Sequence, residues 1–181
     1  MDNMLVQKAC QIREITKLSK ILALDQSSRT TGYTVLDDGK IIKVNHFECI
    51  GDDLGDRLLQ LRKKVLELIN TYDIDEVVFE DIQLQDVNGS KEKGVKTFKI
   101  LAEAFGVVHE TLTEIKMPYS IAMPIQWKAH FKIAGKGRPQ EKKMTQAYVL
   151  KEYGIKCTED EADSLCIALY YYDLTNVFDW S

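Results

Sequence analysis

Short apolar runs along this chain alternate with longer segments in which apolar residues recur every three or four positions. The runs at 20–25 and 74–79 have the length of a strand and apolar centres, which is typical of strands buried on both faces of a sheet. The segments 31–36 and 41–50 are β-rich, and the Asp-Asp-Gly-Lys turn between them predicts a hairpin. The first half of the chain therefore predicts a β-sheet.

Helical spacing appears in four segments after the hairpin. The predicted helices cover 54–69 (capped by Asp52 or Asp53), 96–115, 140–153 and a stretch that begins at the capping box Thr158-x-x-Glu161. A short strand, 120–123, is ended by Pro124. Because a helix precedes the run at 74–79, a right-handed crossover would lay this run parallel to the one at 20–25. The two strands would then end at the same edge of the sheet, where α/β proteins place their sites.

The chain predicts one domain over 20–181, preceded by an N-terminal helical extension over 1–19. The extension has loose helical spacing, typical of an amphipathic helix or a partly ordered arm, and its mixed charges exclude the apolar core of a signal peptide. No apolar stretch approaches the ~20 residues that a membrane span needs. The four cysteines form no CxxC pair, which indicates reduced thiols in an intracellular protein.

Charge is unevenly distributed along the chain. The net charge of -4 disfavours a nucleic-acid partner, but one segment is strongly basic and is opposed only by Glu141. Its basic residues are Lys128, Lys132, Lys136, Arg138, Lys142 and Lys143. Acidic residues gather elsewhere, including 159–163. A basic stripe beside an acidic pocket is the pattern expected when lysines hold a polyanion and a metal centre cuts it.

Four carboxylates carry the chemical argument. Asp25 and Glu80 each end an apolar run, and Asp160 and Asp163 are three residues apart at the start of the last helix, hence on one face of it. A charge in such a place is costly unless something positive neutralises it. Oxygen-only ligands favour Mg²⁺ or Mn²⁺. The set therefore predicts a metal-dependent phosphodiesterase. Glu80 and Asp81 point to opposite faces of a strand, and spacing alone does not choose between them.

Other interpretations of these segments are weaker. The strand and hairpin after Asp25 also resemble the phosphate-binding hairpin of actin-like ATPases, but a second lobe is missing. The run 160–163 resembles a helicase signature, yet no GxxxxGK[ST] loop accompanies it. Among the histidines only His130, inside the basic segment, is a candidate for function. Trp127 and Phe131 could stack on bases, although packing is the simpler interpretation.

Taken together, these residues resemble the RuvC family of Holliday-junction resolvases, within the RNase H-like nuclease superfamily. The matching pieces are Ile-Leu-Ala-Leu-Asp-Gln-Ser-Ser-Arg-Thr-Thr-Gly-Tyr at 21–33, Val-Val-Phe-Glu at 77–80, the Gly-Lys-Gly loop at 135–137 and Asp-Glu-Ala-Asp-Ser-Leu at 160–165. The match runs from about Lys20 to Tyr172. Size and divergence are similar to RuvC-like enzymes of phages infecting Gram-positive bacteria, which would place the protein in the cytoplasm of the bacterial host.

The resemblance implies an α/β, RNase H-like fold with a five-stranded mixed β-sheet flanked by α-helices. It selects Glu80 over Asp81 and implies that Asp25, Glu80, Asp160 and Asp163 hold two Mg²⁺ ions per site, with Mn²⁺ as a substitute. It also implies a homodimer that makes paired symmetric nicks in a four-way DNA junction and leaves 5′-phosphate and 3′-hydroxyl ends. By the same resemblance, the helix at 96–115 is the candidate dimer contact.

Basic residues complete the implied site. Lys128 and Lys142 fall near the family's two functional lysines, although Lys132 or Lys143 could be the true counterparts, and Lys142 is our candidate for a catalytic role. The wider DNA-binding surface would also contain Lys136, Arg138, Gln83, Lys91 and Lys93.

This chain departs from the family at one informative position. Bacterial members carry an aromatic residue three positions after the second acid, where this chain has Gln83. Strict selectivity for four-way junctions is therefore open, and a broader flap or fork endonuclease is the main alternative. A junction protein that binds without cutting would lack some of the four acids, and all four are present here. Cleavage of RNA–DNA hybrids is a weaker alternative, because the terminal acids Asp160 and Asp163 match the resolvase pattern.

Overall fold

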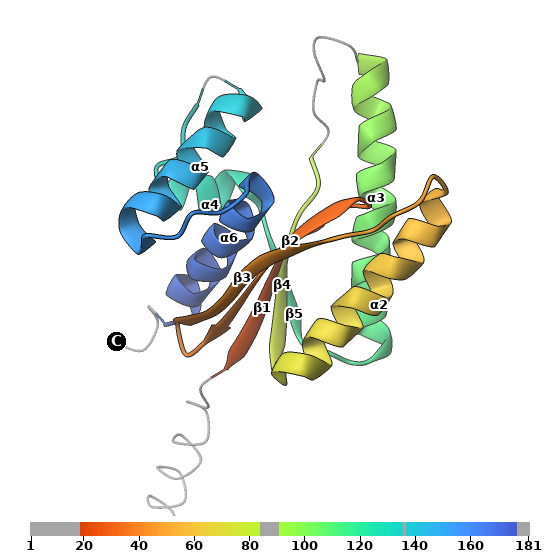
Figure 1. Cartoon of the computed structure of the whole chain (residues 1–181), viewed down its shortest axis with the longest axis horizontal. Coiled ribbons are helices and arrows are strands. Elements are labelled where there is room, and N and C mark those ends of the chain that lie inside the picture. The colour runs from red at the N-terminus through yellow and green to blue at the C-terminus, as the bar shows by residue number, and fades with distance from the viewer. Residues whose placement is uncertain (1–18, 84–90, 136, 177–181) are drawn as a thin grey trace, which may run out of the picture.

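The computed structural model describes residues 19–83, 91–135 and 137–176, and the side chains of 91–93 and 176 are outside this description. Almost all of the predicted N-terminal extension therefore lies outside the described residues. The strands are β1 (Lys20–Asp25), β2 (Thr30–Asp37), β3 (Lys40–Glu48), β4 (Glu76–Glu80) and β5 (Tyr119–Ala122). The helices are α2 (Leu54–Tyr72), α3 (Lys91–Glu114), α4 (Pro124–His130), α5 (Arg138–Tyr153) and α6 (Glu159–Asn176) (Figure 1).

The five strands form one mixed sheet in the order β3-β2-β1-β4-β5. The β2–β3 hairpin forms as predicted and pairs antiparallel to β1. β4 lies parallel to β1 after the α2 crossover, and β5 lies parallel to β4. The predicted mixed sheet and the parallel placement of the two acid-bearing strands are confirmed. Of the two alternatives for the α2 cap, the structure uses Asp53, whose side chain accepts a hydrogen bond from the amide of Asp56.

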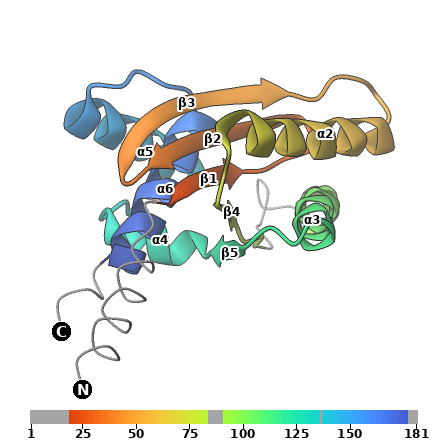
Figure 2. The same cartoon turned by 90° about the horizontal axis from the view of Figure 1, so that it is seen from below.

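Helices cover both faces of the sheet. α2 and α3 lie on one face, and α4, α5 and α6 lie on the other (Figures 1 and 2). β1 serves both layers, since Ile21 and Ala23 pack toward α6 whereas Leu22 and Leu24 pack toward α2 and α3. All four side chains are 0–1% exposed. Burial on both faces explains why this strand appears in the sequence as an unbroken apolar run.

Two helix assignments differ from those predicted. α3 begins at Lys91 and not at the predicted residue 96, because lysine and glutamate are good helix formers even where no apolar periodicity marks the start. α4 was not predicted at all. It is seven residues long, too short to establish a period, and its start depends on Pro124 in the first turn, where a missing amide proton costs nothing.

Other bulk expectations agree with the described part of the chain. Cys49, Cys157 and Cys166 are free thiols. No helix among the described residues is both long enough and apolar enough to cross a membrane.

α6 is held against the sheet by polar contacts as well as by its apolar side chains. The buried hydroxyls of Thr34 on β2 and Ser164 on α6 lie 3.0 Å apart. Gly32 permits the closest approach, because a Cβ at this position would lie 1.9 Å from the main-chain oxygen of Asp160. Gly32 is also the residue of β2 that pairs with Asp25 of β1. One glycine thus brings the start of α6 to the end of the central strand.

Substituting Gly32 by alanine should displace the start of α6 because backbone, which cannot rotate away, occupies the space of the new methyl group. We expect a loss of roughly 2–4 kcal/mol in the free energy of unfolding, measured by urea denaturation. The matched control is Gly106→Ala in α3, where a Cβ has nothing within 4 Å and alanine should stabilise the helix by roughly 0.5–1 kcal/mol. Equal stabilities for the two variants would contradict the assignment of Gly32.

Candidate active site

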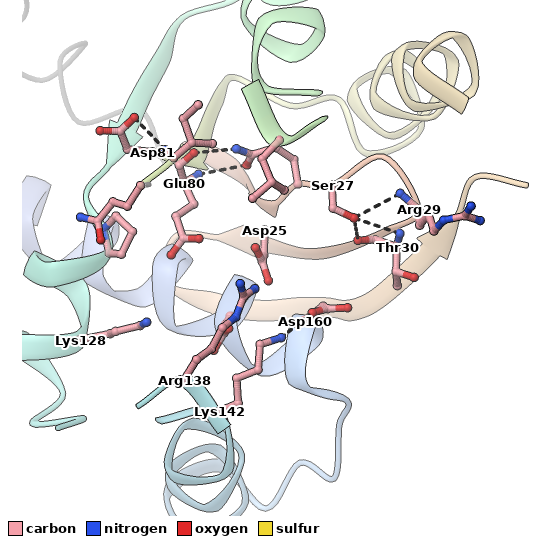
Figure 3. A pocket seen from close by; sticks show the side chains of 16 residues that line it. Asp25, Ser27, Arg29, Thr30, Glu80, Asp81, Lys128, Arg138, Lys142 and Asp160 are labelled. Atoms are coloured by element: carbon pink, nitrogen blue, oxygen red, sulfur yellow. Dashed lines mark hydrogen bonds and ion pairs between the residues drawn. The ribbon is translucent and has the colours of Figure 1, made fainter. Parts of the chain in front are cut away.

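One pocket of about 260 Å³ lies at the edge of the sheet where β1 and β4 end. Five carboxylates line it: Asp25, Glu80, Asp81, Asp160 and Asp163. Four basic side chains line it as well: Arg29, Lys128, Arg138 and Lys142. Figure 3 shows the basic side chains of α4 and α5 pointing toward the carboxylates of β1, β4 and α6. All four acids that the sequence predicted as metal ligands are therefore brought together.

The alternation of side chains between the two faces of the sheet decides whether Glu80 or Asp81 lies beside Asp25. Asp25 continues the series Ile21, Ala23 that faces α6, and Glu80 continues from Val78, which packs in the same layer. Asp81 has the opposite parity and lies just past the strand, where its amide bonds to the carbonyl of Ala122. The structure therefore places Glu80 beside Asp25 and leaves Asp81 at the rim of the pocket.

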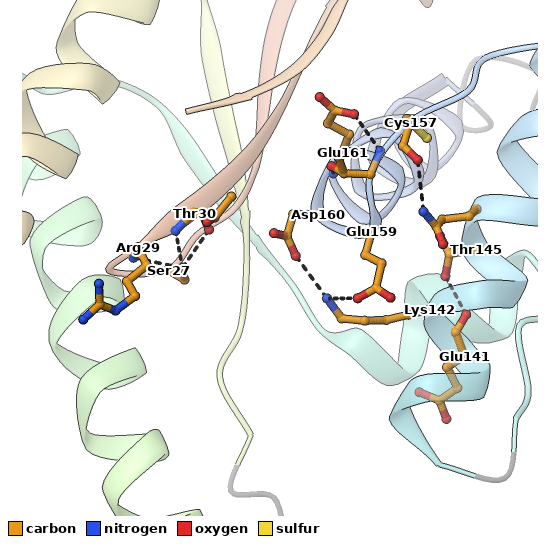
Figure 4. Close-up of polar contacts among 12 residues, drawn as sticks. Ser27, Arg29, Thr30, Glu141, Lys142, Thr145, Cys157, Glu159, Asp160 and Glu161 are labelled. Carbon is orange, nitrogen blue, oxygen red and sulfur yellow. Dashed lines mark hydrogen bonds and ion pairs between the residues drawn. The ribbon is translucent and has the colours of Figure 1, made fainter. Parts of the chain in front are cut away.

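The start of α6 is organised by the predicted capping box. Glu161 accepts a hydrogen bond from the amide of Thr158 at 2.7 Å, and the Thr158 hydroxyl accepts one from the amide of Glu161 at 3.3 Å. The other oxygen of Glu161 lies 2.8 Å from Nδ1 of His46 on β3, a contact that gives His46 the structural role expected of it. This frame sets Asp160 and Asp163 in the first turns of the helix. Figure 4 shows Asp160 near Glu161 of the capping box.

Lys142 is the basic residue in closest contact with the acids. Its Nζ lies 3.0 Å from Oδ1 of Asp160 and 3.2 Å from Oε2 of Glu159, and its side chain is 15% exposed (Figure 4). Burial lowers the pKa of Lys142, but Asp160 and the neighbouring acids outweigh this effect and raise it overall, so the ammonium stays charged. Lys128, on α4, is paired instead with Glu141 at 3.0 Å.

Three acids of the pocket have raised pKa values. Burial, followed by repulsion from Glu80, Asp163 and Asp160, raises the pKa of Asp25 well above its usual range. Burial also raises the pKa of Glu80 to about 7, against a hydrogen bond from Trp127 that lowers it. For Asp163, burial raises the pKa to about 6 despite the nearby charges of Lys142 and Lys128. The pocket therefore disfavours the charged forms of three of its acids, and its own cations only partly offset this effect.

These residues fit a divalent metal ion. All the convergent acidic donors are carboxylate oxygens, which hard cations such as Mg²⁺ prefer. Oδ1 of Asp163 is buried and has no hydrogen-bond partner among the described residues, so it is a lone pair available to a cation. No three acidic, histidine or cysteine side chains of the described residues already form a ready metal-binding group. Because Lys142 holds Asp160, binding requires side-chain adjustment.

The predicted DNA-binding residues are only partly brought together. Lys128, Arg138, Lys142 and Gln83 line the pocket. Lys132 and Lys143 are exposed and do not belong to that lining. Lys136 and the side chains of Lys91 and Lys93 lie outside the described residues. The basic stretch of the sequence is thus divided in space between α4, a loop and α5. The sequence left open whether Lys132 or Lys143 replaces Lys128 or Lys142 in the site, and in the structure Lys128 and Lys142 line the pocket.

Three pocket features were missed in the sequence. Arg29 lies in the β1–β2 turn, where the Ser27 hydroxyl accepts hydrogen bonds from the amides of Arg29 and Thr30. Trp127 and Gln26 both bond to Glu80, contacts between distant segments that no local pattern shows. His130, the one histidine considered for function, lies 2.8 Å from Asp173 and is not among the residues that line the pocket.

The sheet order and the position of the pocket together define the fold class of this protein. The mixed sheet has the order β3-β2-β1-β4-β5 and is flanked by helices, which is the RNase H-like fold. The acids lie at the ends of its two central parallel strands and on the final helix. RuvC of T. thermophilus in complex with a Holliday junction substrate superposes with a TM-score of 0.66 at 18% identity, over 87% of this chain and 95% of that one. The resolvase of Fowlpox virus, in complex with Holliday junction DNA, gives 0.54 at 14% identity, over 87% and 99%.

Sequence relatives narrow the class to a family. The family profile of crossover junction endodeoxyribonuclease RuvC matches residues 21–171, so the chain belongs to the RuvC family of metal-dependent DNA hydrolases. Relatives include RuvC of Ruegeria pomeroyi, 29% identical over 83% of this chain and 88% of that protein, and RuvC of Ehrlichia chaffeensis, 26% identical over 83% and 94%. The predicted family is confirmed, and membership sets aside the actin-like interpretation.

The acid cluster predicts that the metal-free protein loses stability as the pH rises. Burial raises the pKa of Glu80 from 4.5 to about 7, so the folded chain binds a proton that the unfolded chain releases. This contribution is complete below pH 4.5 and is lost as the pH rises through 7. Between pH 5.5 and 8 we expect a loss on the order of 2 kcal/mol, or roughly 4–8 °C in Tm, measured by calorimetry in EDTA.

The variant Glu80→Gln, which cannot titrate there, is the control and should lose less of its stability over the same range. Adding Mg²⁺ at pH 8 should raise the Tm of the wild-type protein, because a ligand of the folded state stabilises it. If the stability of the two proteins changed with pH in the same way, ionisation of Glu80 would not destabilise the folded state.

Proposed function

We propose that this chain is a structure-selective endodeoxyribonuclease that resolves four-way DNA junctions by paired symmetric nicks, leaving 5′-phosphate and 3′-hydroxyl ends. One observation carries the proposal: in a chain of the RuvC family, Asp25, Glu80, Asp160 and Asp163 meet in a pocket whose rim carries four basic side chains. Such a pocket can hold cations among its acids and a phosphodiester at its rim.

The four acids would hold two Mg²⁺ ions, with Mn²⁺ as a substitute. The all-oxygen donor set, the lone pair of Asp163 and the raised pKa values of three of the acids support this assignment. When bound, the ions supply charge neutralisation at the scissile phosphate and activation of the attacking water. Asp25 lies at the end of the central strand, where it is repelled by each of the other three acids, so it is the ligand best placed to serve both ions.

The basic side chains act on the phosphate. Lys142 keeps its charge within the acid cluster and can offset negative charge that develops on the phosphorus. Arg29 lines the pocket from the β1–β2 turn. Lys128 and Arg138 point toward the carboxylates from α4 and α5, on the opposite side (Figure 3). These three can hold the strand on both sides of the scissile bond.

The active form would be a homodimer. Two identical sites related by a two-fold axis match the approximate two-fold symmetry of a four-way junction, and this match explains paired nicks in strands of like polarity. α3, which covers residues 96–114 of the segment 96–115 considered for this role, is the proposed contact between protomers.

A broader activity on flaps and forks is a second candidate. Gln83 is exposed on the rim of the pocket just beyond β4, where bacterial members carry an aromatic residue. An amide cannot wedge into stacked base pairs as a ring does, so discrimination between branched substrates would rest on the dimer geometry alone.

The deciding experiment compares substrates side by side. Purified protein with Mg²⁺ is given end-labelled four-way, three-way, flap and linear duplex DNA, together with the variant Asp25→Asn. We expect symmetric paired nicks in the four-way junction and a loss of cutting of at least about 10³-fold in Asp25→Asn with junction binding retained, because removing one carboxylate charge weakens metal binding rather than DNA contact. Equal cutting of flaps and forks would favour the second candidate, and near wild-type cutting by Asp25→Asn would refute the metal assignment.

Adjacent lysines offer a matched pair. Lys142→Ala should lower the single-turnover cleavage rate on a four-way junction by roughly 10²–10³-fold, because it removes the charge within the acid cluster. Lys143→Ala removes a lysine that is exposed and outside the pocket lining, and should weaken binding at low salt without changing the rate at saturation. If the two variants behaved alike, Lys142 would have no role in the chemical step.

A further inference from the structure

Glu80 is held by a buried indole. Nε1 of Trp127 donates a hydrogen bond of 2.9 Å to Oε1 of Glu80, and Trp127 is 0% exposed. An indole N–H can only donate, so it pairs with an acceptor oxygen of the Glu80 carboxyl group and fixes which way that oxygen points. One oxygen of Glu80 is thereby engaged, and a cation in the pocket would meet this residue through the other.

The main chain of Glu80 is held as firmly as its side chain. The ladder between β1 and β4 ends at the pair Leu24–Phe79. Beyond it, the side-chain amide of Gln26 donates to the carbonyl of Glu80 at 2.6 Å and accepts from its amide at 3.2 Å. Gln26 is 5% exposed. Its side chain thus continues the ladder by one residue after the β1 backbone has turned away.

These contacts come from two different parts of the fold. Trp127 lies on α4, which follows β5, the strand paired with β4, whereas Gln26 lies in the turn after β1. Trp127 also packs in the core layer around α6. Packing alone requires only an apolar ring. It does not account for an indole N–H directed at one of the pocket acids, or for a buried amide that satisfies both backbone groups of the same residue.

We infer that Trp127 and Gln26 are positioning residues, which hold the Glu80 carboxylate in the orientation that binds metal. The inference deepens the proposed function and rests on it, since it takes Glu80 as a metal ligand. Partners that orient a ligating carboxylate contribute to metal affinity without touching the metal, and their loss typically costs roughly 10- to 100-fold.

The test measures metal binding without DNA. Mn²⁺ is titrated into the DNA-free wild-type, Trp127→Phe and Gln26→Met proteins by isothermal calorimetry. Phenylalanine keeps an aromatic ring but lacks the N–H donor, and methionine keeps the length of Gln26 but lacks its amide. We expect Mn²⁺ affinity to fall roughly 10- to 100-fold in each variant, with the Mg²⁺ concentration for half-maximal cleavage rising by a similar factor and junction affinity unchanged.

Tyr171→Phe is the matched control. Tyr171 donates a hydrogen bond to Glu76, the acid at the opposite end of β4, and also packs against the α6 core layer. The control therefore removes an aromatic donor to a carboxylate of the same strand, away from the pocket. It should leave Mn²⁺ affinity unchanged. If both variants lost Mn²⁺ affinity equally, the effect would be one of stability and the inference would be overturned.

A double-mutant cycle shows whether Trp127 acts through Glu80. In the background Glu80→Gln, adding Trp127→Phe should cause less than a two-fold further loss of Mn²⁺ affinity, since the carboxylate that it orients is gone. Full additivity would overturn the inference. Unchanged Mn²⁺ affinity in Trp127→Phe, alongside a loss in Glu80→Gln, would overturn the inference but leave the proposed function intact. A wild-type protein that neither binds Mn²⁺ nor cuts branched DNA would overturn both.

Discussion

The burial of several carboxylates in one pocket is the constraint on which the rest of this structure depends. Asp25, Glu80 and Asp163 each have a raised pKa because burial and neighbouring acids disfavour their charged forms. The fold offsets this cost with two kinds of contact: the ammonium of Lys142 on Asp160, and the indole of Trp127 on Glu80. Both offsets are partial, and what remains is an affinity for added positive charge. In the proposed function, this imbalance is what would favour a metal ion among the acids.

The imbalance also explains the polar contacts around α6. This helix brings two of the acids to the other two, so it has to be held in place against their repulsion. The Thr34–Ser164 hydrogen bond and the pairing of His46 with Glu161 attach it to β2 and β3. Apolar packing resists separation of the layers but allows sliding, whereas directional hydrogen bonds also set the position of the helix along the sheet. The acids are thus held at the edge of the sheet by contacts that contribute nothing to the chemistry.

Much of this arrangement could be predicted from the sequence, because its signals are local. The apolar run of β1, the hairpin turn and the capping box before α6 each depend on neighbouring residues, and all three were predicted. The choice between Glu80 and Asp81 depends on which face of β4 looks toward α6, a fact that spacing does not contain. α4 is too short to show a period, and the contacts of Trp127 and Gln26 with Glu80 join segments about fifty residues apart. Division of the basic stretch among separate elements is likewise a property of the folded chain.

The contact between Gly32 and the carbonyl of Asp160 has a consequence for how the sequence can change. It joins main chain to main chain, so no side chain takes part in it and no exchange of side chains within α6 can alter it. Substitutions along the helix leave this close approach possible, whereas any side chain at position 32 would push the first turn of α6 away from β2. Over evolutionary time, position 32 is therefore restricted to glycine by geometry, independently of the chemistry of the acids that it brings together.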